Sequence, residues 1–85
     1  MERFVYFYFM KNEPDKIRQV APAHVDYWRS AGLPGYMGGP FADRTGGLIS
    51  FEAASLEDAA EMVKKDPFTG NNLIGEWWVK EWILE

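Results

Sequence analysis

The segment from Phe4 to Met10 limits most strongly what this chain can fold into. It reads Phe-Val-Tyr-Phe-Tyr-Phe-Met, a composition that is typical of a β-strand. Hydrophobic and polar residues do not alternate along it, so both of its faces are apolar and both need to be covered. A second strand predicted at residues 77–84 also has no cleanly polar face, because tryptophans lie on each side of it.

Between these two strands the sequence predicts two helices and two further strands. A first helix begins after Asn12, a candidate N-cap, and Pro14 suits its first turn. Pro22 lacks an N–H group and clashes with the preceding turn, so we expect a break or kink near residues 20–22. The main helix should then run from about Pro22 to Ala31 and end at Gly32.

In the second half of the chain, turn and capping residues mark the ends of the elements more clearly. Short strands are expected at residues 35–41 and 48–53, joined by a turn at residues 42–47 that contains two glycines. Ser55 is a good N-cap for a second helix, with Asp58 in the position of a capping-box acid. The inward face of this helix should carry Leu56, Ala59, Ala60, Met62 and Val63. Asp66-Pro67 should end the helix, and residues 68–75 should form a loop.

The resulting order is β-α-β-β-α-β, the ferredoxin-like arrangement of an α+β protein. We expect one domain over residues 1–85, with a four-stranded antiparallel sheet whose one face is covered by the helices. The other face would be bare, yet the first and last strands are apolar there too. A second copy that packs sheet against sheet solves this problem, so the pattern itself predicts a face-to-face homodimer.

Composition excludes several classes of protein. The net charge is −4 and no basic tract is present, which argues against nucleic-acid binding. The longest apolar run is too short to cross a membrane, and Met-Glu-Arg leads directly into the first strand, so we expect a cytoplasmic protein without a membrane partner. With no cysteine and a single histidine, thiolate and multi-histidine metal sites are excluded, and we expect no metal.

That histidine, His24, is the most informative polar residue. Counted in helical steps it lies on the face formed by Ile17, Val20, Ala21, Trp28 and Ala31, whereas Asp26, Arg29 and Ser30 fall on other faces. An imidazole aimed at a core needs a hydrogen-bond partner, because an unpaired buried polar group costs about 1–3 kcal/mol. The partner is either a backbone carbonyl, which makes His24 structural, or a carboxylate, which makes it a candidate acid/base.

Four segments of the chain resemble the YciI-related (YCII) family. They are Ala21-Pro22-Ala23-His24, Gly39-Pro40, Ser55-Leu56-Glu57-Asp58-Ala59 and Asp66-Pro67-Phe68. The resemblance spans nearly the whole chain and implies a dimeric α+β barrel with a His–Asp pair in a pocket of each subunit. Carried over, the pair is His24 and Asp66. One characterised relative of this family is a dehydrochlorinase that acts on a chlorinated hydroxyquinol.

The residues themselves leave the role of Asp66 open. It follows the last turn of the second helix, where the helix dipole disfavours an anion, so its carboxylate should seek a cation or donor. His24 is one candidate partner, and Lys64 and Lys65 are others. The glycines before Pro40 favour a bulge in the sheet, or else a wall without side chains beside a flat ligand. Tyr8, Tyr36 and Arg44 could bind an acidic or phenolic substrate, although Arg44, in a hairpin turn, is expected to be a solvated charge.

We therefore expect His24 and Asp66 to be catalytic, and Tyr8, Trp28, Gly39, Pro40 and Phe68 to contact a small-molecule ligand. A carboxylate that holds one imidazole nitrogen leaves the other as a general acid/base near neutral pH. The favoured function is a lyase or isomerase without a cofactor, acting on a small aromatic or cyclic compound. The alternatives are an accessory dimer that binds a ligand without turnover, and a monooxygenase that binds haem or needs no cofactor.

Overall fold

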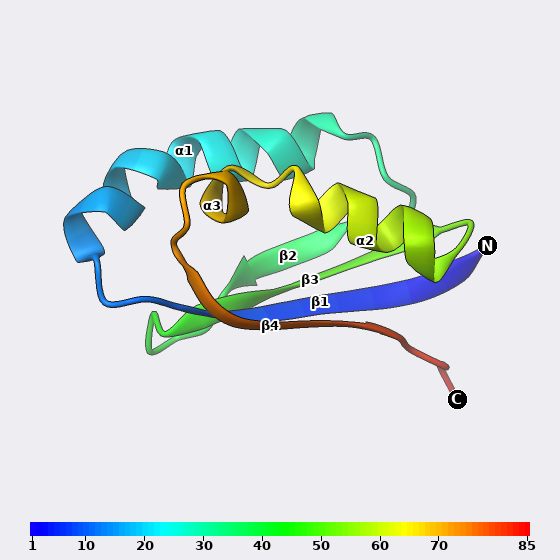
Figure 1. The fold of residues 1–85 in the computed structure, drawn as a ribbon. Helices are drawn as coiled ribbons and strands as arrows, with labels where there is room; N and C mark the ends of the chain where they lie inside the picture. Colours follow the sequence, from blue (N-terminus) through cyan, green and yellow to red (C-terminus); the bar gives the residue numbers. More distant parts are fainter.

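The computed structural model describes residues 1–85 as a sheet covered on one face by helices (Figure 1). The elements are, in order, β1 (Glu2–Met10), α1 (Pro14–Ser30), β2 (Met37–Pro40), β3 (Gly46–Ala53), α2 (Leu56–Lys64), α3 (Pro67–Gly70) and β4 (Ile74–Glu81). The strands are antiparallel and ordered β2-β3-β1-β4. This is the ferredoxin-like α+β arrangement, so the predicted fold class is confirmed.

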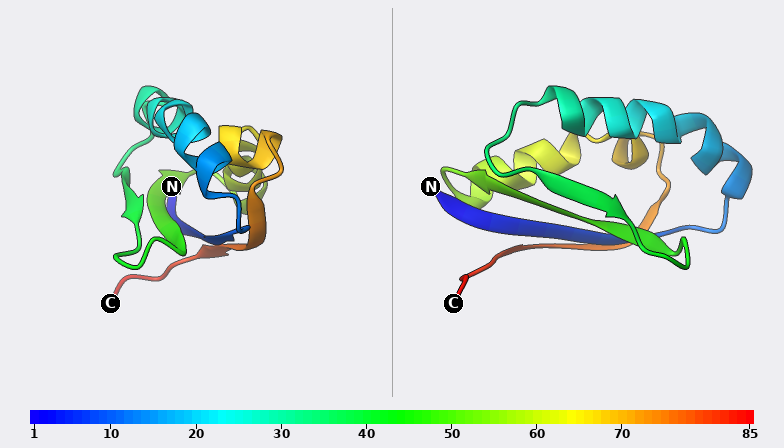
Figure 2. Two further views of the ribbon diagram at one scale, coloured as in Figure 1. Left: turned by 90° about the vertical axis from the view of Figure 1, so that its left-hand side faces the viewer. Right: turned by 180° about the vertical axis from the view of Figure 1, so that it is seen from behind.

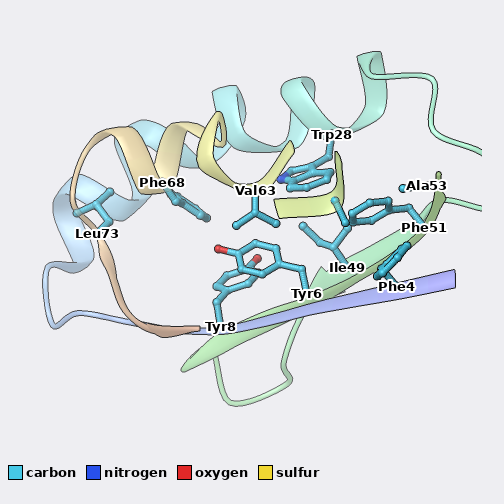
Figure 3. Packing of buried hydrophobic residues seen from close by; sticks show 11 residues of the cluster. Phe4, Tyr6, Tyr8, Trp28, Ile49, Phe51, Ala53, Val63, Phe68 and Leu73 are labelled. Atoms are coloured by element: carbon cyan, nitrogen blue, oxygen red, sulfur yellow. The ribbon is translucent and has the colours of Figure 1, made fainter. Parts of the chain in front are cut away.

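β1 lies inside the sheet, between β3 and β4. Its side chains alternate between the two faces, and Phe4, Tyr6 and Tyr8 point toward the helices (Figure 3). There they pack with Phe51 of β3 and Trp28 of α1, and all five side chains are buried. The core therefore lies between the sheet and the helical layer, and β1 contributes three of its aromatic side chains.

The opposite face of the sheet is covered by no helix (Figure 2). On that face β1 presents Val5, Phe7 and Phe9, as the lack of alternation in the sequence required. Phe7 stacks on Trp78 of β4, with ring centroids 5.1 Å apart. An apolar outer face is thus present within one chain, and nothing in this chain hides it.

Helix α1 is continuous through Pro22, so the predicted break is wrong. Its first turns are inclined to the rest of the helix, in line with a kink (Figure 1). Pro22 removes a single helical hydrogen bond, and Ile17 and Val20 before it and Trp28 after it all pack on the core. Asn12 is not the cap, because Glu13 occupies the N-cap position without a side-chain hydrogen bond. Gly32, with φ of +66°, follows the helix end as predicted.

The second helix begins as the sequence indicated, with the Ser55 hydroxyl accepting a hydrogen bond from the Asp58 N–H at 3.1 Å. Ala59 and Val63 face inward, but Leu56 is exposed, so its predicted inward position is wrong. Residues 67–70, expected to belong to a loop, form the short helix α3. The last strand ends at Glu81 rather than Leu84. No helix has the length and apolar character needed to cross a membrane.

Candidate functional site

A cavity of about 510 Å³ lies between α1 and the β2 edge of the sheet. Strand β1 contributes Tyr8 and Met10, and β2 and β3 contribute a stretch rich in glycine. Helix α1 contributes a row of side chains on one face, Ile17, Ala21, His24, Val25 and Arg29. Phe68 of α3 also lines it, so both the sheet and the helical layer take part in the cavity.

His24 stands between this cavity and the core. It is 8% exposed, and its Nδ1 atom lies 2.8 Å and 2.9 Å from the two carboxylate oxygens of Asp66. Its ring stacks on Phe68, with centroids 4.1 Å apart and planes 19° apart. The partner of the histidine is therefore a carboxylate and not a backbone carbonyl. Asp66 fixes the imidazole orientation at the ring edge, and Phe68 fixes it by stacking on the ring face.

Asp66 is completely buried and accepts hydrogen bonds from two further groups that can only donate. The Phe68 N–H donates to Oδ1 at 2.9 Å, and the Trp28 Nε1–H donates to Oδ2 at 3.0 Å. With these donors in place, the carboxylate is suited to accept a third hydrogen bond from Nδ1–H of His24. Nε2 then carries the lone pair, on the side of the ring away from Asp66.

The local reason for this arrangement is the Asp66-Pro67 junction. Asp66 is the N-cap of α3, with Pro67 in the first turn and an extended backbone at φ −62° and ψ 131°. The carboxylate therefore faces the N-terminal end of α3, in addition to following the C-terminal end of α2. Lys64 pairs with Glu61 instead, which removes it as a partner of Asp66.

Tyr8 lies on the other side of the imidazole. Its hydroxyl is 3.3 Å from Nε2 of His24, and its ring lines the cavity. Burial raises the pKa of Tyr8 well above its usual range, and the nearby charge of Asp66 raises it further. The phenol is therefore neutral at physiological pH and donates its proton toward Nε2. Tyr8, His24 and Asp66 form one connected hydrogen-bonded row.

Space for the Tyr8 hydroxyl depends on a glycine in β3. Gly47 pairs with Tyr8 across the β1–β3 ladder. A Cβ atom at Gly47 would lie 2.5 Å from the Tyr8 hydroxyl oxygen and 2.9 Å from the Gly39 carbonyl oxygen. The Gly46-Gly47 pair, which suggested only a turn, thus permits the close approach that brings Tyr8 to His24.

Four of the five predicted ligand-contacting residues, Tyr8, Gly39, Pro40 and Phe68, line the cavity, and Trp28 does not. Trp28 is 1% exposed and points its indole N–H at Asp66, so it supports the pair from inside the core. The predicted bulge at residues 38–40 is also wrong, since β2 pairs with β3 in regular register from Met37 to Pro40.

Two charged residues of the cavity lining were not selected from the sequence. Arg44, expected to be a solvated charge, and Arg29, placed on another helix face, both line the cavity. Helical spacing does indicate Arg29, because Ala21, Val25 and Arg29 are four residues apart and share one face. No comparable local signal places Arg44, which depends on where the β2–β3 turn lies. The structure contains no group of three or more His, Cys, Asp or Glu side chains arranged to hold a metal ion.

The fold and this site together define a class of protein: a ferredoxin-like α+β protein with a buried His–Asp pair beside a cavity. Within this class the chain belongs to the YCII family, since the YCII-related domain model matches residues 1–83. The family expected from the resemblance is therefore confirmed.

A curated relative and several solved structures are similar to this chain. The uncharacterized protein YjpA of Bacillus subtilis (strain 168) is 47% identical over 49 residues, covering 58% of this chain and 56% of YjpA. The match thus spans little more than half the length of that relative. The 5-chloro-2-hydroxyhydroquinone dehydrochlorinase TftG of Burkholderia phenoliruptrix AC1100, in complex with 2,5-dihydroxybenzoquinone, superposes with a TM-score of 0.83. It is 23% identical, with 95% of this chain and 93% of TftG covered.

An antibiotic biosynthesis monooxygenase also has this fold, with a TM-score of 0.66 and 15% identity over 100% of this chain and 99% of the other. At these identities both structures establish the fold of the chain and leave its reaction open.

Proposed function

We propose that this protein is an enzyme of the lyase or isomerase type that acts on a small aromatic or cyclic compound without a cofactor. The observation that carries the proposal is the position of His24, whose Nδ1 is held by a buried carboxylate while the residue itself lines a 510 Å³ cavity. A buried acid/base pair beside a cavity is a common feature of catalytic sites.

His24 is the general base in this proposal. Nε2 accepts a proton from an O–H or an activated C–H bond of the substrate. The electron pair of that bond forms a new π bond, and a leaving group such as chloride departs with the electron pair of its own bond. In an isomerisation the proton returns to another atom instead. Asp66 stabilises the imidazolium ion that forms, and it keeps the ring oriented without taking up the proton.

Tyr8 binds the substrate in the same step. Its hydroxyl contacts Nε2 at 3.3 Å, a long hydrogen bond that a substrate donor can replace. Once displaced, the hydroxyl remains beside the base as a donor to the substrate oxygen. The similarity of fold to the dehydrochlorinase TftG supports elimination as the reaction type. It does not assign the substrate of TftG to this chain.

The test is a turnover screen with chlorinated and unchlorinated hydroxyquinols, in which turnover is measured as chloride release and as quinone absorbance. We expect turnover in the wild type and a loss of about 10²–10⁴-fold in His24→Ala, the usual contribution of general acid–base catalysis. Asp26→Asn, an exposed change on the same helix, should keep full activity. Turnover that persists in His24→Ala would exclude this function. Saturable binding without turnover would favour the accessory, ligand-binding alternative.

The haem alternative is less compatible with the geometry. An axial ligand needs an imidazole nitrogen open to the iron, but Nδ1 is bonded to Asp66 and Nε2 faces the Tyr8 hydroxyl. Phe68 also covers one face of the ring. The residues around His24 therefore do not fit a haem group.

We also propose that the protein is a homodimer through the outer face of the sheet. This face gathers Val5, Phe7 and Phe41 with Leu48, Trp78 and Trp82, of which the last three are 39%, 38% and 45% exposed. An exposed cluster of this kind is uncommon on a monomer. Sheet-to-sheet packing of two copies about a two-fold axis would cover the same residues on both.

Size-exclusion chromatography with light scattering, which measures the molar mass of the eluted protein, tests the proposed dimer. We expect the mass of two chains in the wild type and of one chain in Trp78→Glu. Leu56→Glu is the matched control, because Leu56 is 53% exposed on α2, in the helical layer. A wild type that elutes as a monomer at micromolar concentration would contradict the proposed dimer.

A further inference from the structure

The ionisable side chains around the cavity differ in sign from the protein as a whole. The chain has 13 acidic and 9 basic residues, yet the cavity lining contains Arg29 and Arg44 and no aspartate or glutamate. Asp66 does not line the cavity: it is fully buried behind His24 and bonded to three donors. A cavity lined by one sign of charge concentrates ligands of the opposite sign.

Neither arginine has a partner within the protein. The other ion pairs of the chain join Arg3 to Glu52, Lys16 to Glu13, Arg18 to Asp15 and Lys64 to Glu61. Arg29 and Arg44 take part in no ion pair and no side-chain hydrogen bond. Each guanidinium therefore keeps its planar set of five donors free, and that set matches the geometry of a carboxylate or another oxyanion.

Arg44 is also held in an unusual backbone conformation. Its φ is +65°, a left-handed value that costs a residue with a Cβ about 1–2 kcal/mol. The turn is fastened by Asp43, whose Oδ1 accepts hydrogen bonds from the Thr45 N–H at 3.0 Å and the Thr45 hydroxyl at 2.7 Å. Glycine or asparagine would fit this position with less strain. The Arg44 N–H also donates to the Phe41 carbonyl at 2.9 Å, so the turn is held by its own hydrogen bonds and fixes where the unpaired Arg44 side chain leaves the backbone, at the cavity lining.

The rest of the cavity suits a flat, apolar body. Ile17, Val25 and Phe68 supply hydrophobic surface, and β2 supplies backbone alone at Gly38 and Gly39. Gly38 leaves little room for a side chain, since a Cβ there would lie 3.1 Å from Ile49 Cγ1 and from the Tyr36 hydroxyl. A planar ring fits against such a wall.

We propose that the ligand of this cavity is a small planar organic anion, and that Arg29 and Arg44 receive its oxyanion while its ring lies against the glycine wall. This inference names the substrate class of the proposed enzyme and in that respect rests on the proposed function. Tyr8 and His24 lie in the same cavity, so the ring of a bound anion would be placed beside the base.

Calorimetric titration with benzoate and with benzamide, its neutral counterpart of similar shape, tests the inference. We expect the wild type to bind benzoate at least tenfold more tightly than benzamide. Added salt should weaken benzoate binding and leave benzamide binding unchanged. Arg29→Gln and Arg44→Gln should each lower the affinity for benzoate by about fivefold, the value of one partly exposed charge pair.

Arg18→Gln is the matched control, because it removes the same charge from α1 outside this cavity, and it should bind benzoate as the wild type does. Arg44→Lys should lose part of the affinity, since lysine keeps the charge without the fork. Equal affinity for benzoate and benzamide, no measurable benzoate binding, or unchanged binding in both arginine variants would overturn the inference.

His24→Gln separates this inference from the proposed function. The variant should lose turnover and retain the preference for benzoate. An arginine-dependent preference without any turnover would leave the substrate class standing and remove the enzyme. Turnover of neutral rings that requires His24 but neither arginine would support the enzyme and exclude an anion as its substrate.

Discussion

His24 Nδ1 lies 2.8 Å from Asp66 Oδ1, although the two residues are 42 positions apart in the chain. The contact joins the middle of α1 to the N-cap of α3, and it is buried on both sides. A charge-assisted hydrogen bond in such a place sets both the tautomer and the orientation of the imidazole.

Asp66→Asn should change the tautomer of His24. An amide can accept on one atom only, so its NH2 group would face either the Phe68 N–H or the Trp28 Nε1–H, and in both cases one of the two atoms that face His24 Nδ1 becomes a donor. We expect a loss of about 1–3 kcal/mol in the free energy of unfolding, with the fold retained. The ¹⁵N shifts of the single histidine need no assignment and report which nitrogen carries the proton. Identical shifts in wild type and variant would mean that no such coupling exists.

Trp28→Phe should weaken the same site from within the core. The change removes the indole N–H that donates to Asp66 Oδ2 at 3.0 Å and leaves a small cavity. We expect the free energy of unfolding to fall by about 2 kcal/mol or more, together with the activity. Urea denaturation measures the first, and the turnover assay measures the second. Trp77→Phe, at a side chain that is 48% exposed, is the control and should change stability far less.

Gly47→Ala should displace the Tyr8 hydroxyl. The added Cβ would lie 2.5 Å from that oxygen, so Tyr8 has to move away from Nε2. We expect a loss of about 1–3 kcal/mol in stability, typical of overpacking, and reduced activity. Combining the change with Tyr8→Phe, which lacks the hydroxyl, should recover part of the stability. Gly70→Ala is the control, because a Cβ there meets nothing within 4 Å. A fully stable Gly47→Ala would contradict the close packing.

Stability should fall in alkaline solution. Burial, and then the charge of Asp66, raise the pKa of both Tyr6 and Tyr8 above their usual range. Unfolded tyrosines lose their protons near pH 10, while these two keep theirs in the folded state. The unfolded state then binds fewer protons, so the free energy of unfolding decreases as the pH rises above about 10.

Urea midpoints measured between about pH 8 and pH 11 follow this effect, and the unperturbed tyrosine pKa near 10 sets that range. The variant with Tyr6→Phe and Tyr8→Phe should show a shallower decline. Tyr6→Phe alone should keep or increase stability at neutral pH, because its hydroxyl is buried without a hydrogen-bond partner. An equal decline in the wild type and the double variant would refute the assignment of the alkaline effect to these tyrosines.

The elements that local patterns encode could be predicted from the sequence. The apolar run at Phe4–Met10 indicated a strand with two hydrophobic faces, and β1 has them. Ser55 indicated a helix start, and its hydroxyl accepts from the Asp58 N–H. Gly32 indicated a helix end, and it takes the positive φ that suits glycine. Each of these signals acts within a few residues, through periodicity, capping or backbone freedom.

His24 and Asp66 were also identified from the sequence, though as a pair only through the resemblance to a family. The helical face of His24 showed that it points inward, and no local rule could select Asp66 over a backbone carbonyl as its partner. That choice depends on how α1 lies over the sheet and on α3, a single turn that the pattern at residues 67–70 did not reveal.

Tertiary packing alone decided the remaining features of the site. It kept α1 helical through Pro22, because core contacts on both sides outweigh one lost hydrogen bond. It turned Trp28 toward Asp66 rather than the cavity, and it brought Arg44 from a hairpin turn to the cavity lining. These outcomes depend on contacts between segments far apart in the chain, whose geometry is set by the whole core. The sequence by itself determined the four strands, the two longer helices and most of their inward faces, because those depend on local periodicity and capping.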